Sequence, residues 1–181
     1  PERLESVLRV VYLVFNEGYA ASAGDDWMRP ALCEEALRLA RILAHRLPVA
    51  PVLGLLALME LQASRAAART DAQGAPVLLD QQNRARWDWL QIDRGQQVLA
   101  RALAAGGGHD PYVLQARIAA CHAAARRADG TDWPRIASLY TQLLQVQPSP
   151  VVALNRVVAI LRSEGAFAAW AQLQPLLDDP R

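Results

Sequence analysis

The sequence predicts an all-α fold of about eight helices, joined by short turns and packed as antiparallel hairpins. Apolar residues recur at intervals of three and four along most of the chain, and no segment shows the alternation of a series of β-strands. Proline and glycine interrupt these stretches often, which keeps the connections short. With 181 residues, 52% hydrophobic and 20% charged, the chain is long enough for a single domain with a substantial core.

Three helices are predicted in the first part of the chain, at about residues 2–16, 29–47 and 52–70. The second opens at Asp25, at Asp26 or at the Arg29–Pro30 pair. Its apolar residues at helical spacing predict a buried stripe of Leu32, Ala36, Leu39, Leu43 and Leu47. The third is apolar on most sides in its first half, which predicts burial. Its second half, with Arg65 and Arg69, is expected to return to solvent.

Residues 76–89 interrupt the helical pattern and bring together two Trp, two Arg, two Asp and one Asn. We expect this segment to be a loop laid across the helices. Arg84, Arg86, Trp87 and Asp88 have the chemistry of an Arg–carboxylate and cation–π cluster. Such a cluster either pins the loop to the helices or contacts a ligand. Both hold if the pinned loop shapes a surface that binds a partner.

Five more helices are predicted, at about residues 88–105, 110–127, 132–147, 149–164 and 166–177. Asp88 is a good N-cap for the first of them. Asp110–Pro111 and Ser149–Pro150 each place proline directly after an N-cap residue, which is a strong start signal. Thr131 or Asp132 caps the helix between these two starts. Gly165 ends the next-to-last helix.

Residues 110–177 are the most repeat-like part of the chain. The positions that follow Pro148 match the large, medium, glycine and aromatic positions of a tetratricopeptide unit, at Leu154, Val157, Leu161, Gly165 and Phe167. This spacing predicts a tetratricopeptide-like superhelical arrangement in which Leu154, Val157, Val158 and Leu161 point inward. The alternative is an irregular helical bundle.

Composition and spacing argue against several classes of function. A net charge of +1 gives no strong field toward nucleic acid or membranes, and the longest apolar run, 49–59, is shorter than the ~20 residues of a membrane span. Cys33 and Cys121 are isolated, which indicates reduced thiols of a cytoplasmic protein. No spacing predicts a metal site, a cofactor site or a catalytic centre. We therefore expect no enzyme activity, no cofactor, no direct contact with nucleic acid and no membrane insertion.

Three parts of the chain resemble one family: residues 12–19, residues 78–88, and the blocks 131–133 and 148–156. Together they resemble the C-terminal extension of bacterial extracytoplasmic-function RNA polymerase sigma factors. In that family a tetratricopeptide-like domain follows the two sigma regions. Gln81 and Asn83 stand where the family commonly has Asp.

The resemblance implies a regulatory or protein-interaction domain, residues 1–181, of a longer chain that acts in transcription initiation. Its partners would be the N-terminal sigma regions of the same chain, the RNA polymerase core or a regulatory protein. The candidate interaction surface consists of Asn16, Glu17, Tyr19, Arg84, Arg86, Trp87, Asp88, Asn155 and Arg156. The alternative is a free-standing helical-repeat scaffold that binds peptides.

Overall fold

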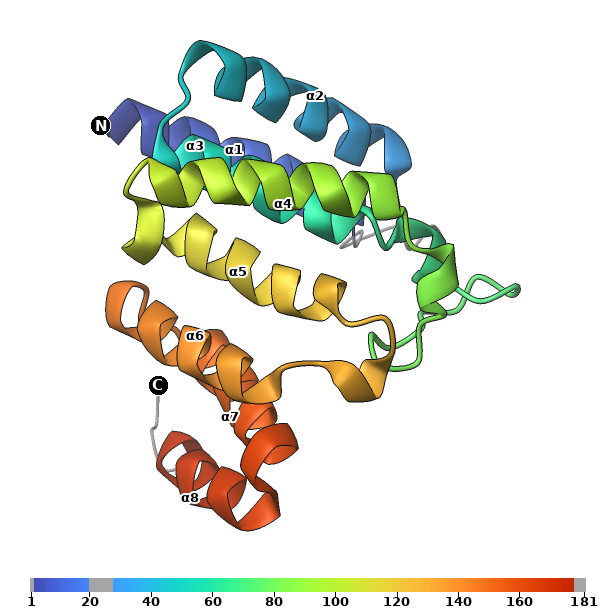
Figure 1. Cartoon of the computed structure of the whole chain (residues 1–181), viewed down its shortest axis with the longest axis vertical. Helices are drawn as coiled ribbons and strands as arrows, with labels where there is room; N and C mark the ends of the chain where they lie inside the picture. The colour runs from blue at the N-terminus through green and yellow to red at the C-terminus, as the bar shows by residue number, and fades with distance from the viewer. Residues whose placement is uncertain (1, 20–27, 178–181) are drawn as a thin grey trace.

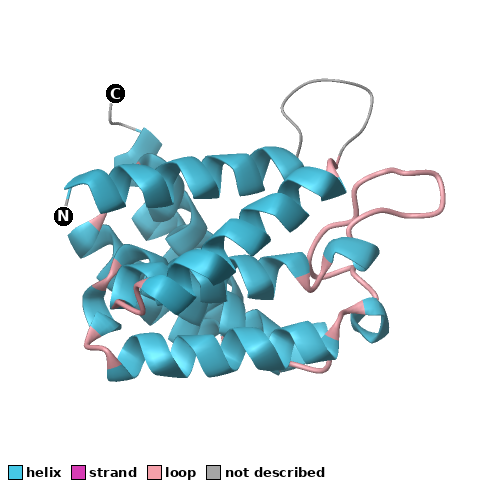
Figure 2. Ribbon diagram, turned by 90° about the horizontal axis from the view of Figure 1, so that it is seen from above, coloured by secondary structure: helices cyan, strands magenta, loops and turns pink. Residues whose placement is uncertain are grey.

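The computed structural model describes residues 2–19 and 28–177, and over these residues it confirms the all-α prediction. Its eight α-helices are α1 Glu2–Tyr19, α2 Pro30–Arg46, α3 Ala50–Ala63, α4 Trp89–Ala104, α5 Pro111–Ala124, α6 Trp133–Val146, α7 Pro150–Glu164 and α8 Ala166–Leu177. Four short 3-10 helices join them: η1 Ala66–Ala68, η2 Arg84–Arg86, η3 Gly107–His109 and η4 Ala128–Gly130. Most connections are short, and the longest described loop lies between η1 and η2 (Figure 2).

Neighbouring helices pack as antiparallel hairpins that stack along the long axis of the molecule (Figure 1). The helix α1 packs on α2, and α3 packs on both α4 and α5. Farther along, α6 lies between α5 and α7, and α8 covers α7. The packing therefore agrees with the predicted helical-repeat arrangement.

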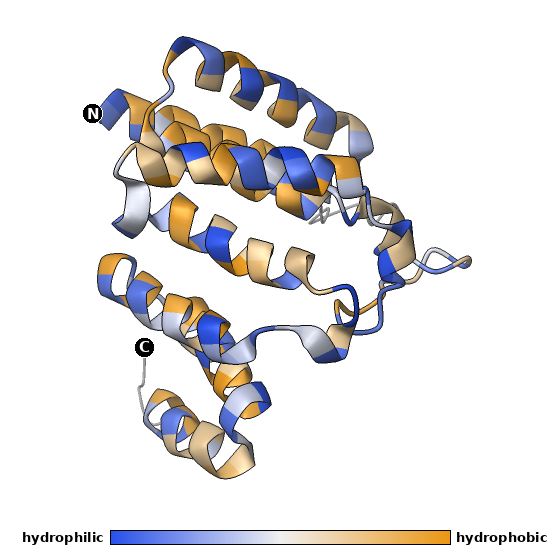
Figure 3. Ribbon diagram, viewed as in Figure 1, coloured by the Kyte–Doolittle hydropathy of each residue, from blue (hydrophilic) through white to orange (hydrophobic). Residues whose placement is uncertain are grey.

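The helix α3 is the centre of the core. Its ten consecutive residues Val52–Leu61 are all buried, and α1, α2, α4 and α5 all contact it. Figure 3 shows its hydrophobic ribbon lying behind α4. At Gly54 the backbone of α5 comes so close that a Cβ atom would lie 2.8 Å from the Val113 nitrogen. This burial agrees with the prediction for the first half of the helix.

The prediction for the end of this helix is wrong. The helix stops at Ala63 rather than near residue 70, and the chain turns through η1. Ser64 and Ala68 are buried, and Arg65 and Arg69 are half-buried, so the segment does not return to solvent. The reason lies in the tertiary structure. The backbone N–H of Asp88 donates a hydrogen bond to the Ser64 carbonyl at 2.8 Å, and this bond holds the end of the following loop over the segment.

The buried face of α2 also differs from the predicted stripe. Leu39 and Leu47 are each 40% exposed, whereas the buried residues are Ala36, Leu37, Ala40 and Ala44. These residues belong to the core that α2 shares with α1 and α3. The helix begins at Pro30 with Arg29 as its N-cap, and the alternative starts at Asp25 and Asp26 lie outside the described residues.

The inward face predicted for α7 is wrong at three of its four positions. Val157 is buried, but Leu154, Val158 and Leu161 are 51%, 44% and 46% exposed. The helix packs against α6 and α8, and the residues that meet this core are Val157, Ala159 and Ile160. The opposite face, which carries Val158, borders a cavity.

A groove beneath a pinned strap

Residues 77–87, which we call the strap, are tied at both ends to distant parts of the fold. At the start, the Val77 N–H donates to the Arg69 carbonyl at 2.7 Å. At the end, the Arg84 side chain is buried, and its Nη1 atom donates to the carbonyls of His122 and Ala125 at 2.8 and 2.6 Å. These carbonyls lie at the C-terminal end of α5, where carbonyls lack partners within the helix and a cation is favoured. Arg84 thus caps α5 from the strap.

Trp87 forms a second anchor beside Arg84. Its side chain is 3% exposed and packs in a small cluster with Leu61, Ala68, Ile92 and Ala123. The Arg84 guanidinium lies 4.7 Å from the Trp87 ring centroid, which is cation–π geometry.

Asp88 and Arg86, the two other residues of the predicted cluster, differ from Arg84 and Trp87 in their contacts. The Asp88 carboxylate accepts a hydrogen bond from the Gln91 N–H at 2.8 Å and so caps α4, as predicted. Arg86 is exposed on η2. The strap is therefore pinned by Arg84 and Trp87, and Asp88 starts the next helix.

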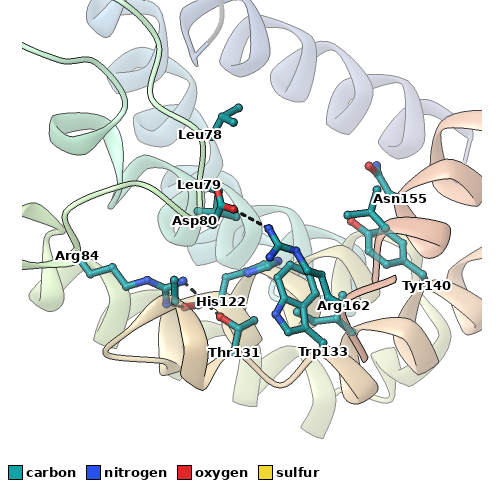
Figure 4. Close-up of a pocket in the computed structure, with 13 residues that line it drawn as sticks. Leu78, Leu79, Asp80, Arg84, His122, Thr131, Trp133, Tyr140, Asn155 and Arg162 are labelled. Atoms are coloured by element: carbon teal, nitrogen blue, oxygen red, sulfur yellow. Dashed lines mark hydrogen bonds and ion pairs between the residues drawn. The ribbon is translucent and has the colours of Figure 1, made fainter. Parts of the chain in front are cut away.

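Two adjoining cavities, of about 360 and 450 Å³, lie beside the strap. Both are lined by Leu79, His122, Tyr140 and Asn155, so they adjoin one another, and we call the two together the groove. The strap, α5, α6 and α7 contribute to the first cavity (Figure 4). Residues of α1 and α3 join them around the second.

The groove has walls of mixed apolar and polar residues and an excess of positive charge. Arg65, Arg84 and Arg162 line it, and Asp80 is the one acidic group among its described lining residues. The Asp80 carboxylate pairs with Arg162 Nη2 at 2.6 Å, which joins the strap to α7 (Figure 4). Arg162 also lies 5.7 Å from the ring centroid of Trp133.

His122 is held neutral at the junction of the two cavities. Burial, together with the positive charges of Arg65 and Arg84, lowers its pKa to about 4. Its ring meets the Trp133 ring edge-on, with centroids 5.3 Å apart. Burial also raises the pKa of the Tyr140 hydroxyl, which therefore stays protonated. The positive charge of the groove thus comes from arginine alone.

The structure divides the predicted interaction surface into separate places. Asn155 lines both cavities and Arg84 lines one of them. Arg156 instead ties helices together, because it donates hydrogen bonds to Thr141 Oγ1 at 2.9 Å and to Gln172 Oε1 at 3.0 Å. These contacts place Arg156 in the packing of α6, α7 and α8.

The three residues predicted on α1 do not line the groove. Glu17 pairs with Arg29 at 3.0 Å, next to the start of α2. The Tyr19 ring stacks on Phe15, and the Arg69 guanidinium lies 3.6 Å from the Tyr19 ring centroid. Asn16 is half-buried on the same helix. These contacts hold the end of α1 against α2 and η1.

Several groove residues were not predicted. Asp80 belonged to the segment that stood out in the sequence, but nothing local marked its partner Arg162, 82 positions away. His122 and Tyr140 read as ordinary helix residues. Their positions depend on how α5, α6 and α7 stack, which no local pattern encodes.

Over the two described ranges, no three His, Cys, Asp or Glu side chains come close enough together to hold a metal ion. None of the described helices has the length and apolar character needed to span a membrane.

Comparison with known proteins gives two matches. Residues 3–103, more than half of the chain, match DUF6596, a family of unknown function. This stretch contains α2, α3, the strap and all but one residue of each of α1 and α4. An uncharacterized protein of Rhizobium meliloti (strain 1021) is 47% identical over 176 residues, which cover 97% of this chain and 41% of the relative. No solved structure matches significantly. The chain spans less than half of that relative's length, and it belongs to the DUF6596 family.

Proposed function

We propose that this chain is a regulatory, protein-interaction domain of an RNA polymerase sigma factor. Its partner would be the sigma regions of the same factor, the polymerase core or a regulatory protein. The observation that carries the proposal is that one stretch, residues 78–88, both bears the resemblance to sigma-factor extensions and forms a wall of the groove. The domain would act in the cytoplasm through surface contacts and without a catalytic step.

The strap has the properties of a contact surface held in a defined shape. Arg84 and Trp87 are buried and fix its end, while Leu78 remains 66% exposed at the edge of the groove. An exposed leucine on a pinned loop contributes apolar contact area to a partner at a small loss of conformational entropy. The length of the relative outside the match leaves room for further domains that would supply such a partner in cis.

A binding titration tests this proposal. The 181-residue chain is titrated with the separately produced sigma regions encoded by the same gene, and then with core polymerase. We expect saturable binding to one of them, and we expect Leu78→Ser to weaken it. Leu90→Ser is the matched control, because Leu90 is 67% exposed on α4 and does not line the groove.

Two results would count against the sigma-factor role. One is the absence of saturable binding to the sigma regions, to core polymerase and to any regulator encoded beside the gene. The other is equal loss of binding in the Leu78 and Leu90 variants, which would remove the strap from the interface. The second candidate function is a free-standing peptide-binding scaffold, which the groove's size and its mixture of apolar and polar lining residues favour.

A further inference from the structure

We propose that the groove binds an acidic, apolar segment of a partner protein, and that Asp80 of the strap holds Arg162 until a carboxylate of the partner displaces it. The proposal deepens the interaction role set out above and rests on it. It does not depend on whether the partner is a sigma region.

The strap supplies part of the groove wall and its one carboxylate. Leu79 lines both cavities and lies where they adjoin. The next residue, Asp80, pairs with Arg162 on α7 at 2.6 Å. The groove therefore already pairs one arginine with a carboxylate that follows an apolar side chain.

The middle of the strap is tied to the rest of the fold by the packing of Leu79 and by the Asp80–Arg162 pair. The fixed points at its ends are the Val77 hydrogen bond to Arg69 and the buried Arg84 guanidinium. Between them, a local turn joins Gln81 to Leu78, and Gln82 Nε2 donates to the Val77 carbonyl at 3.2 Å. Both contacts lie within the strap itself. The Asp80–Arg162 pair, with side chains 42% and 48% exposed, is thus the polar latch that joins the middle of the strap to the groove wall.

The charge of the groove determines which group can replace Asp80 as the partner of Arg162. When Asp80 leaves, the described lining residues hold Arg65, Arg84 and Arg162 and no carboxylate. His122 adds no charge near neutral pH. Partner carboxylates are therefore attracted to the groove, and an arginine fork pairs with them in a directed geometry.

Apolar residues in the walls favour apolar side chains next to those carboxylates. Leu58, Ile118, Leu143 and Val152 line the second cavity beside several glutamines, and Ile136 and Val158 line the first. A nucleic-acid strand would place phosphates along this surface without filling it. The chain as a whole is also nearly neutral, with 19 basic and 18 acidic residues. An acidic peptide with leucine-like residues fits both properties.

The test is a fluorescence-anisotropy titration of the 181-residue chain with a labelled peptide, Gly-Leu-Leu-Asp-Glu-Leu-Asp-Gly. Its counterpart carries Asn and Gln in place of Asp and Glu. We expect the acidic peptide to bind more tightly than the neutral one. Asp80→Asn should raise the affinity for the acidic peptide by about fivefold, the change that loss of one partly exposed ion pair produces.

A second pair of variants tests whether the gain in affinity comes from the freed Arg162 guanidinium or from a loosened strap. In the Asp80→Asn background, Arg162→Gln should cancel most of the gain. Arg94→Gln, an exposed arginine on α4 that does not line the groove, should leave the gain unchanged. Circular dichroism spectra establish that each variant is folded.

Three outcomes would overturn the proposal: no change in affinity on Asp80→Asn, equal binding of the acidic and neutral peptides, or tighter binding of a short oligothymidylate than of the acidic peptide. The peptide experiment contains no sigma region or polymerase. Peptide binding, with no binding to those proteins or to a regulator encoded beside the gene, would therefore refute the sigma-factor role and leave the groove assignment standing.

Discussion

Arg84 and Ala125 are joined by a 2.6 Å hydrogen bond from the guanidinium Nη1 atom to the backbone carbonyl, across 41 positions of the sequence. The same nitrogen also reaches the His122 carbonyl, and Nη2 approaches Thr131 Oγ1 at 3.4 Å. One side chain of the strap therefore completes the C-terminus of α5 and holds the turn that leads to α6. The groove depends on this link, because its lining residues come from both sides of it.

Replacement of Arg84 should be strongly destabilising. In Arg84→Ala, buried carbonyls lose their donor, and each unpaired group costs about 1–3 kcal/mol, so the free energy of unfolding should fall by about 2–4 kcal/mol. Urea denaturation followed by circular dichroism measures the change. The control is Arg86→Ala, two residues away and exposed, which should change the stability by less than about 0.5 kcal/mol. Similar losses in both variants would show that Arg84 does not anchor the strap.

Arg41 should contribute to the stability of the fold, because it pairs with the buried carboxylate of Glu60. Glu60 is buried at 2% exposure, and its carboxylate accepts from Arg41 at 2.7 Å and from Gln91 at 2.9 Å. Arg41→Ala leaves the carboxylate with Gln91 alone, which should lower the free energy of unfolding by about 1–3 kcal/mol. The matched control is Arg38→Ala, because Arg38 pairs with Glu35 on the exposed face of the same helix. We expect about 0.5 kcal/mol or less there, and an equal loss in the two variants would contradict the prediction.

Gly54 should not tolerate a methyl group. A Cβ at this position would lie 2.6 Å from Val113 Cγ2 and 2.8 Å from the Val113 nitrogen, so α3 and α5 would have to separate. Gly54→Ala should therefore destabilise the fold by about 1–3 kcal/mol, although alanine favours a helix. Gly108→Ala is the control, because a Cβ there meets nothing within 4 Å. Thermal unfolding should show a lower midpoint only for Gly54→Ala, and an unchanged midpoint would mean that the two helices can separate at little cost.

His122 should make the protein sensitive to acid. Its folded-state pKa is about 4, whereas an unfolded histidine titrates near pH 6.5. As the pH falls below about 6.5, the unfolded chain takes up the proton first, so stability declines between pH 6.5 and 4, by up to ~1.4 kcal/mol per pH unit, and this contribution levels off below pH 4.

The variant His122→Gln isolates this contribution. It also loses the edge-on contact with Trp133, so its stability at pH 8 should be lower than that of the wild type. Its decline between pH 6.5 and 4 should nevertheless be shallower, because no proton is taken up at this position. Denaturation curves at a series of pH values measure both slopes. Identical slopes would mean that His122 is not the group that resists protonation.

The starts of several helices were predictable from the sequence because their signals are local. Asp88, Asp110 and Asp132 each accept hydrogen bonds from backbone N–H groups two or three residues ahead. Ser149 begins α7 as predicted, but its side chain makes no cap hydrogen bond. The continuous apolar character of α3 likewise indicated burial on most sides, since a helix without a polar face has no side to turn to water.

Which faces of the helices are buried was less predictable, because hydrophobicity alone does not say which neighbour is present. On α2 the alanines pack inward and Leu39 is exposed. On α7 the leucines expected in the core lie on exposed positions instead. The tetratricopeptide-like spacing predicted the hairpin arrangement correctly but not the orientation of this helix.

Local patterns were enough to predict an all-α chain, the starts of several helices and the unusual segment at residues 76–89, because these follow from periodicity, capping and turn chemistry within a few residues. What that segment does depends on contacts between distant parts of the chain. Arg84 meets Ala125, and Asp80 meets Arg162, across 41 and 82 positions. Such pairs form only when the helical hairpins have packed against one another. The groove is therefore a property of the packed fold, since residues from α1, α3, α5, α6, α7 and the strap meet there through packing alone.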